Sequence, residues 1–184
     1  MIKQLTPELW LSQSPLYYTN SGIFLSEAEA CLIDPGIYPS EIASLAQFVS
    51  THQAKAKALI LTHSHWDHIL GPAQFPGVPI IVQTHYGEEL AAHEDDLMRQ
   101  ISTWIEREQV AYATPITLPR PDVAFEDRLE LDIGKLRLRL LHAPGHAVDQ
   151  CVIYEPESAT LWAADMLSDL EIPFVSHSLH AYER

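Results

Sequence analysis

Residues 58–68 read ALILTHSHWDH, an apolar run followed by a cluster of three histidines and an aspartate. A short continuous apolar run such as residues 58–61 is typical of a strand that is buried on both faces. The chain leaves such a strand in extended form, so we expect His63 and His65, two residues apart, to project to the same side. Two imidazoles on one side can bind a single metal ion.

The residues that follow this pair extend the same site. Asp67 and His68 lie where the chain bends toward Gly71 and Pro72, so their side chains could bind a second ion nearby. The spacing differs from the helical His-Glu-x-x-His pattern of metalloproteases, and neither Gly-x-Ser-x-Gly nor a phosphate-binding loop is present. The stretch therefore indicates a metal loop at the end of a buried strand.

Two later predicted strands also end on residues of metal-ligand type. Residues 136–141 run into Ala143-Pro144-Gly145-His146, and residues 161–164 run into Asp165. A single histidine after a strand is usually a loop residue, and a single aspartate usually caps a helix. Several such residues after three strands are better explained by one metal site. The candidate ligands are His63, His65, Asp67, His68, His146 and Asp165.

The remaining patterns predict an α/β chain that forms a single domain over residues 1–184. Apolar residues at helical spacing predict a helix after Pro39 and a longer one over 86–109, whereas three prolines within 113–122 indicate an irregular connection. Further strands are expected at 9–11, 22–25, 30–33 and 78–82 in a first half, and at 123–125, 129–131, 136–141, 151–154 and 160–164 in a second sheet.

Composition restricts the classes of partner. The chain has 11 Lys and Arg residues against 25 Asp and Glu, a formal charge of -14, which disfavours binding to nucleic acid. No run of 18 apolar residues and no signal-peptide pattern occurs, so we expect a cytoplasmic protein without a membrane span. Cys31 and Cys151 lie in apolar stretches and are interpreted as buried thiols.

With these motifs in this order, the sequence resembles the metallo-β-lactamase superfamily, and Asp34-Pro35-Gly36 matches that family's early aspartate motif. The resemblance implies an αββα sandwich of two mixed sheets with outer helices and two metal ions between the sheets. It implies that the first ion is held by His63, His65 and His146, and the second by Asp67, His68 and a bridging Asp165. Asp34 would orient the ligand loop.

The same resemblance implies a zinc-dependent hydrolase, in which a metal-bound hydroxide attacks an ester, thioester or lactone of a small-molecule substrate. Asp67 would be the catalytic residue that orients the hydroxide. The Trp66-Asp67-His68 run is most similar to thioesterases related to glyoxalase II. Iron or manganese in place of zinc, an iron-dependent oxidoreductase similar to persulfide dioxygenases, and a metal-binding fragment without turnover are the alternatives.

The sequence departs from the family pattern near its end. That pattern continues beyond the bridging aspartate to a final Gly-His, whereas this sequence ends at residue 184, shortly after Asp165. We therefore expect an incomplete C-terminal part and a possible homo-oligomer, since an uncovered edge favours self-association. His177 and His180 lie in this tail, and replacement of the last ligand by either one is an alternative.

Overall fold

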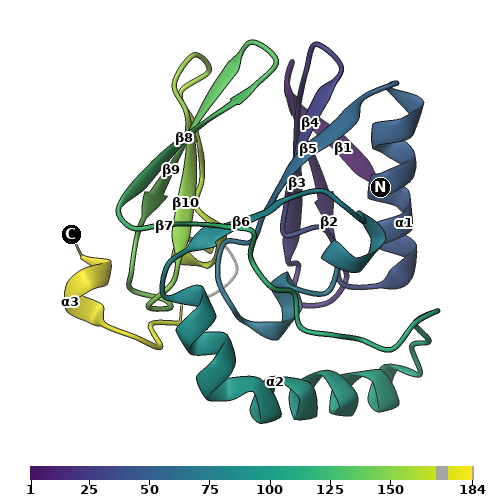
Figure 1. Cartoon of the computed structure of the whole chain (residues 1–184), viewed down its shortest axis with the longest axis vertical. Coiled ribbons are helices and arrows are strands. Elements are labelled where there is room, and N and C mark those ends of the chain that lie inside the picture. The colour runs from purple at the N-terminus through teal and green to yellow at the C-terminus, as the bar shows by residue number, and fades with distance from the viewer. Residues whose placement is uncertain (169–173, 184) are drawn as a thin grey trace.

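The computed structural model describes residues 1–168 and 174–183, which form two facing β-sheets with one helix outside the first sheet and a longer helix across the lower end of the sheets in the view of Figure 1. The first sheet has seven strands in sequence order. They are β1 (Ile2–Thr6), β2 (Leu9–Gln13), β3 (Asn20–Ser26), β4 (Glu29–Ile33), β5 (Lys55–Ile60), β6 (Ile80–Gln83) and β7 (Val123–Phe125). The second has the order β11-β10-β9-β8, with β8 (Arg128–Ile133), β9 (Leu136–His142), β10 (Cys151–Glu155) and β11 (Thr160–Trp162). The expected α/β class with two sheets is confirmed.

Three details of the sheets differ from the sequence predictions. The strand β7 was expected in the second sheet, but it pairs in parallel with β6 in the first. The second sheet is antiparallel throughout the described residues rather than mixed, because turns and loops too short for a crossover connect its strands. The strand β1 was not predicted, and its mostly exposed residues lack the apolar pattern of a core strand.

Three α-helices are described: α1 (Pro39–Thr51), α2 (Tyr86–Glu108) and the short α3 (Leu179–Tyr182). The helix α1 begins with a proline, and the Glu41 carboxylate accepts hydrogen bonds from the backbone N–H groups of Ile37 and Tyr38. Its buried face packs on the outer side of the first sheet, whereas α3 lies against Gly145 at one end of the second. No helix among the described residues is long and apolar enough to cross a membrane.

The core lies between the two sheets and is built by strand alternation. In β9, Leu136, Leu138 and Leu140 are buried while Arg137 and Arg139 are exposed. These leucines pack against first-sheet residues in a single cluster, whose other members include Phe24, Cys31, Ile33, Ala58, Ile60, Cys151, Ile153 and Trp162. This shared core holds the two sheets together and sets the relative positions of their loops.

The parallel part of the first sheet places the metal loop. Because β4 and β5 run in parallel, Asp34 after β4 and His63 after β5 emerge at the same edge. In the second sheet β9 and β11 both run antiparallel to β10, so His146 and Asp165 follow strands that end at one edge. The Cys151 N–H donates to the Thr62 carbonyl at 2.8 Å, which joins these two edges.

Candidate metal centre

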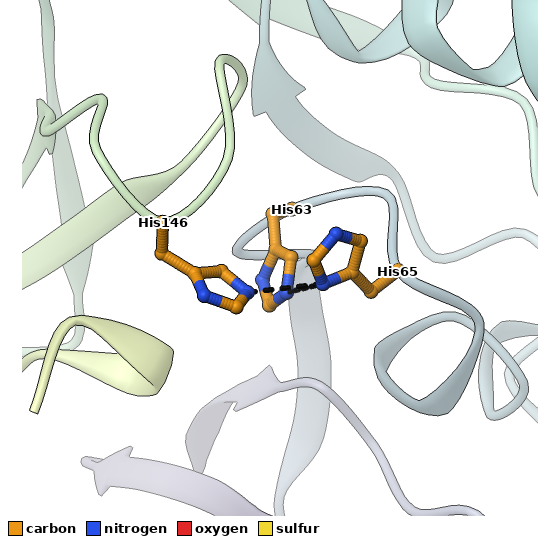
Figure 2. A group of neighbouring side chains, drawn as sticks. All are labelled: His63, His65 and His146. Carbon is orange, nitrogen blue, oxygen red and sulfur yellow. Dashed lines mark hydrogen bonds between the residues drawn. The ribbon is translucent and has the colours of Figure 1, made fainter. Parts of the chain in front are cut away.

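Three histidine side chains converge between the two sheets (Figure 2). His63 Nε2 and His146 Nε2 each lie 3.0 Å from His65 Nδ1. His63 is fully buried and His146 is 5% exposed, so water has little access to either ring. His63 and His65 therefore project to the same side, as their spacing predicts, and His146 reaches them from the loop after β9.

The hydrogen-bond partners of Nδ1 in His63 and His146 determine whether the Nε2 atom of each ring bears a hydrogen or a lone pair. His146 Nδ1 lies 2.7 Å from the Phe174 carbonyl oxygen, so it must donate a hydrogen. The Thr62 hydroxyl donates to Asp34 and can only accept from His63 Nδ1, which therefore also carries its hydrogen. Both Nε2 atoms then have lone pairs directed at His65 Nδ1, where one proton can satisfy only one of them. A metal ion would satisfy all three, so these residues fit one.

A second group lies next to the first and contains carboxylates. His68 Nδ1 is 2.9 Å from Asp34 Oδ2, and the buried His68 Nε2 is 3.3 Å from Asp165 Oδ1 and 3.6 Å from Asp67 Oδ2. Ligand atoms of His63, His68 and Asp165 lie within 4.8 Å of one another. This group of three therefore contains His63 as its third member. The resemblance implied Asp67 as the third ligand of the second ion. A neutral His68 would leave its Nε2 lone pair facing two carboxylates, an arrangement that requires a proton or a cation.

The pKa values favour neutral imidazoles at His63 and His65 and an ionised carboxylate at Asp165. Burial lowers the pKa of His63 well below its ordinary value and that of His65 to about 4. Burial raises the pKa of Asp165, but the neighbouring His68 outweighs it and lowers the value to about 2. Burial also lowers the pKa of His68, yet the three aspartates around it raise the value well above normal. Neutral imidazole and ionised carboxylate are the forms that bind metal.

Asp34 makes the contacts that its expected orienting role requires. It is 2% exposed, and its carboxylate accepts from the Thr62 N–H at 2.8 Å, the Thr62 hydroxyl at 2.7 Å and His68 Nδ1. Its backbone has a φ of 44°, and Ala164, just before Asp165, has a φ of 45°. Such left-handed backbone is unusual outside glycine, and the other seven non-glycine residues that adopt it among the described residues lie in turns.

Several site contacts had no signal in the sequence. The Thr19 hydroxyl donates to Asp67 Oδ2 at 3.3 Å from the loop between β2 and β3. The Phe174 contact to His146 uses a backbone carbonyl, which any residue type would supply. Asp149 is 1% exposed, neither of its carboxylate oxygens has a hydrogen-bond partner among the described residues, and burial raises its pKa to about 6.

The tail histidines are not brought into either ligand group of the described residues. The His177 N–H donates to the Gly145 carbonyl at 3.2 Å, and the Ser178 N–H donates to the same oxygen at 3.1 Å. His180 belongs to the four-residue helix α3. The backbone of this segment therefore holds the loop that contains His146 in place. Nothing among the described residues supports replacement of a ligand by His177 or His180.

Comparison with known proteins relates this geometry to a family. Residues 15–183 match the family model described as the metallo-beta-lactamase superfamily. The chain is 27% identical over 148 residues to the hydroxyacylglutathione hydrolase GloC of Haemophilus influenzae, covering 80% of this chain and 65% of that protein. A hydroxyacylglutathione hydrolase of Francisella tularensis subsp. novicida is 25% identical over 150 residues, covering 79% and 46%. The chain thus spans about half to two thirds of these relatives.

A solved structure shows the same fold. The metallo-beta-lactamase from Pontibacter korlensis superposes with a TM-score of 0.71 at 21% sequence identity. The superposition covers 94% of this chain and 74% of that one. At this identity the similarity establishes the arrangement of sheets and helices.

Proposed function

The chain belongs to the metallo-beta-lactamase superfamily, and from this premise we propose that it is a zinc-dependent hydrolase that cleaves an ester, thioester or lactone of a small molecule. The family and its hydroxyacylglutathione hydrolase relatives support a metal-dependent hydrolase in general terms. The choice of zinc, the bond cleaved and the roles of single residues are the proposal.

One observation carries the proposal. The Nε2 atoms of His63 and His146 each lie 3.0 Å from Nδ1 of His65, and both Nε2 atoms have lone pairs directed at that nitrogen. Three imidazoles are a common ligand set of catalytic zinc, which needs a fourth position for water or substrate. His68, Asp165 and Asp67 would hold a second cation beside it. Carboxylate oxygens in this second group also suit manganese, and imidazoles also suit iron.

The chemistry that zinc supplies at such a site is to lower the pKa of a water molecule from about 15.7 to about 7. Asp67 is 15% exposed, so its carboxylate can reach a water and accept a proton from it while the buried carboxylate of Asp34 cannot. The Thr19 hydroxyl donates to Asp67 Oδ2 and limits its rotation. Asp34 holds His68 from behind and keeps its Nε2 directed into the site.

The proposed substrate class is a thioester of the hydroxyacyl-glutathione type. Two relatives that cover about four fifths of this chain carry that activity in their names. The Trp66-Asp67-His68 run is the sequence feature that favours this subfamily. Oxygen esters and lactones are related substrates, because the same attack on a carbonyl carbon opens them.

The test is hydrolysis of a hydroxyacyl-glutathione thioester, a phenyl ester and a lactone by zinc-loaded protein. His65→Ala should lower kcat/KM at least about a hundredfold and reduce zinc content, because it removes one of three ligands. The matched control is His93→Ala, a histidine on the outer surface of α2 whose side chain is 60% exposed. It should leave both quantities unchanged.

Other outcomes would overturn the proposal. Equal turnover in His65→Ala and the parent protein would remove the assigned site from the reaction. Full metal occupancy without turnover of any of the three substrates would favour the metal-binding fragment. Iron in the purified protein together with substrate-dependent oxygen uptake would favour the oxidoreductase.

A further inference from the structure

A cavity of about 460 Å³ lies apart from the candidate metal ligands, none of which lines it. One wall is the segment 69–80, which follows the metal loop, and the other is the irregular connection 112–122 between α2 and β7. This volume lies within the range of pockets that bind small molecules. The proposed hydrolase reaction makes no use of this cavity.

The walls are more apolar than polar, and hydrogen bonds hold them in place. Ile42, Leu70 and Phe75 are buried at the base of the cavity, and several prolines line it. Proline has a fixed φ and no N–H group, so these walls offer few hydrogen-bond donors and little freedom to collapse. A cavity of this kind suits an apolar ligand whose shape is already accommodated.

Hydrogen bonds fix both ends of the connection. At its start the Tyr112 hydroxyl donates to the Ile37 carbonyl oxygen. At its end the Asp122 N–H donates to the Ile80 carbonyl and the Asp122 carboxylate accepts from the Ile80 N–H, each at 2.9 Å. These contacts anchor the two ends of the connection, and the cavity lies between the connection and the segment 69–80.

Arg120 is the cation of this cavity and has no ion pair among the residues that the structure describes. Other arginines, such as Arg99, Arg107 and Arg137, each pair with an acidic side chain. Asp122 lines the same cavity, but one of its carboxylate oxygens is bonded to Ile80. In a chain of net charge -14, an arginine without an acidic partner is available for an anion from solution.

We propose that this cavity binds a small apolar carboxylate, with its hydrocarbon part between the proline-rich walls and its carboxylate on the Arg120 guanidinium. Volume, apolar walls and one cation at the rim are the features that such an amphipathic anion requires. The site is separate from the metal centre, so the proposal does not depend on the hydrolase activity.

The test is calorimetric titration of the whole chain with sodium decanoate below its micelle concentration. Saturable binding of one decanoate is expected, and Arg120→Gln should weaken it about tenfold through loss of the charged hydrogen bonds. Arg128→Gln is the matched control, because Arg128 is also an exposed arginine without an ion pair in the described residues but lies on β8, outside the cavity. Decanol, which has no charge, should bind Arg120→Gln and the parent protein equally.

Two further variants locate the site. Ala113→Trp should block decanoate by filling the cavity, and Ala73→Trp serves the same purpose from the opposite wall if the first variant unfolds at a lower temperature than the parent. His65→Ala should bind decanoate as the parent does. If His65→Ala loses decanoate binding and Arg120→Gln keeps it, the anion binds at the metal centre and the proposal is overturned. Absence of saturable decanoate binding to the parent protein would also overturn it.

Discussion

Among single residues, Asp34 connects the two ligand groups, because its carboxylate bonds to Thr62 before His63 and to His68. Asp34→Ala would leave the Thr62 N–H buried without a partner, so we expect a loss of about 3 kcal/mol in the free energy of unfolding. Zinc affinity should fall by about 10- to 100-fold. Urea unfolding with chelator present and a zinc titration measure the two effects.

Asp122→Ala is the control for this change, because it also removes a carboxylate that accepts one backbone N–H group, but at an exposed position. Its loss should stay below about 1 kcal/mol and leave zinc affinity unchanged. An equal loss in the two variants would show that Asp34 has no special role.

Asp149 should make stability depend on pH. Burial raises its pKa from 3.8 to about 6, so between these values the folded chain holds a proton that the unfolded chain has lost. Stability of the metal-free protein through this group therefore falls as pH rises from 4 to 6. Asp149→Asn removes the buried charge and should stabilise the metal-free protein by about 2 to 3 kcal/mol at pH 7.

At pH 4 the same substitution should have little effect, because Asp149 is then mostly protonated in the folded protein. Urea unfolding at the two pH values, with chelator present, measures the difference. The control Asp95→Asn concerns an exposed aspartate of α2 and should change stability little at either pH. Destabilisation by Asp149→Asn at pH 7 would contradict the expected cost of its buried charge.

At the scale of elements, two hairpin turns join the sheets at a distance from the metal loop. Gly134, between β8 and β9, has a φ of 56°, and its N–H donates to the Glu29 carboxylate of the first sheet at 2.9 Å. A Cβ atom at Gly134 would lie 2.4 Å from the Ser26 carbonyl oxygen of the turn between β3 and β4. This close backbone contact leaves no room for a side chain.

A pair of glycine substitutions separates backbone strain from this steric clash. Gly77 has a φ of 77° and open space around its missing Cβ, so Gly77→Ala should cost only the left-handed strain of about 1 to 2 kcal/mol. Gly134→Ala adds the clash and should destabilise the protein clearly more. Urea unfolding measures both variants, and equal losses would mean that the contact with Ser26 yields easily.

At the scale of the whole molecule, the candidate ligands come from both sheets. His63, His65 and His68 follow β5, while His146 follows β9 and Asp165 follows β11. A bound ion would therefore connect the two halves of the core, and unfolding would have to release it. Zinc at 100 times its dissociation constant should raise the free energy of unfolding by about 2.7 kcal/mol.

Thermal unfolding with zinc, with calcium and with chelator tests this expectation. Zinc should raise Tm, whereas calcium should do little because it prefers oxygen ligands to the three imidazoles. In His65→Ala the zinc shift should be much smaller. A zinc shift of the same size in this variant would place the stabilising ion elsewhere.

The sequence by itself indicated the strand ends and the residue types of the candidate site. The two-residue spacing of His63 and His65 after an apolar run specifies their common side, because side chains alternate along extended backbone. The helix α2 was predicted to within one residue, since its apolar periodicity is long and regular. Local periodicity carries this information within one segment.

Only the tertiary structure decided which distant groups meet. It placed β7 in the first sheet, brought His63 beside His68 and Asp165, and put the Phe174 carbonyl on His146. Strand pairing and the packing of one sheet on the other determine these contacts. The periodicity of apolar residues in the sequence does not reveal either of them. The candidate ligands of residues 58–68 could therefore be identified from the sequence, whereas their meeting with His146 and Asp165 in the candidate cation site depends on the shared core between the sheets.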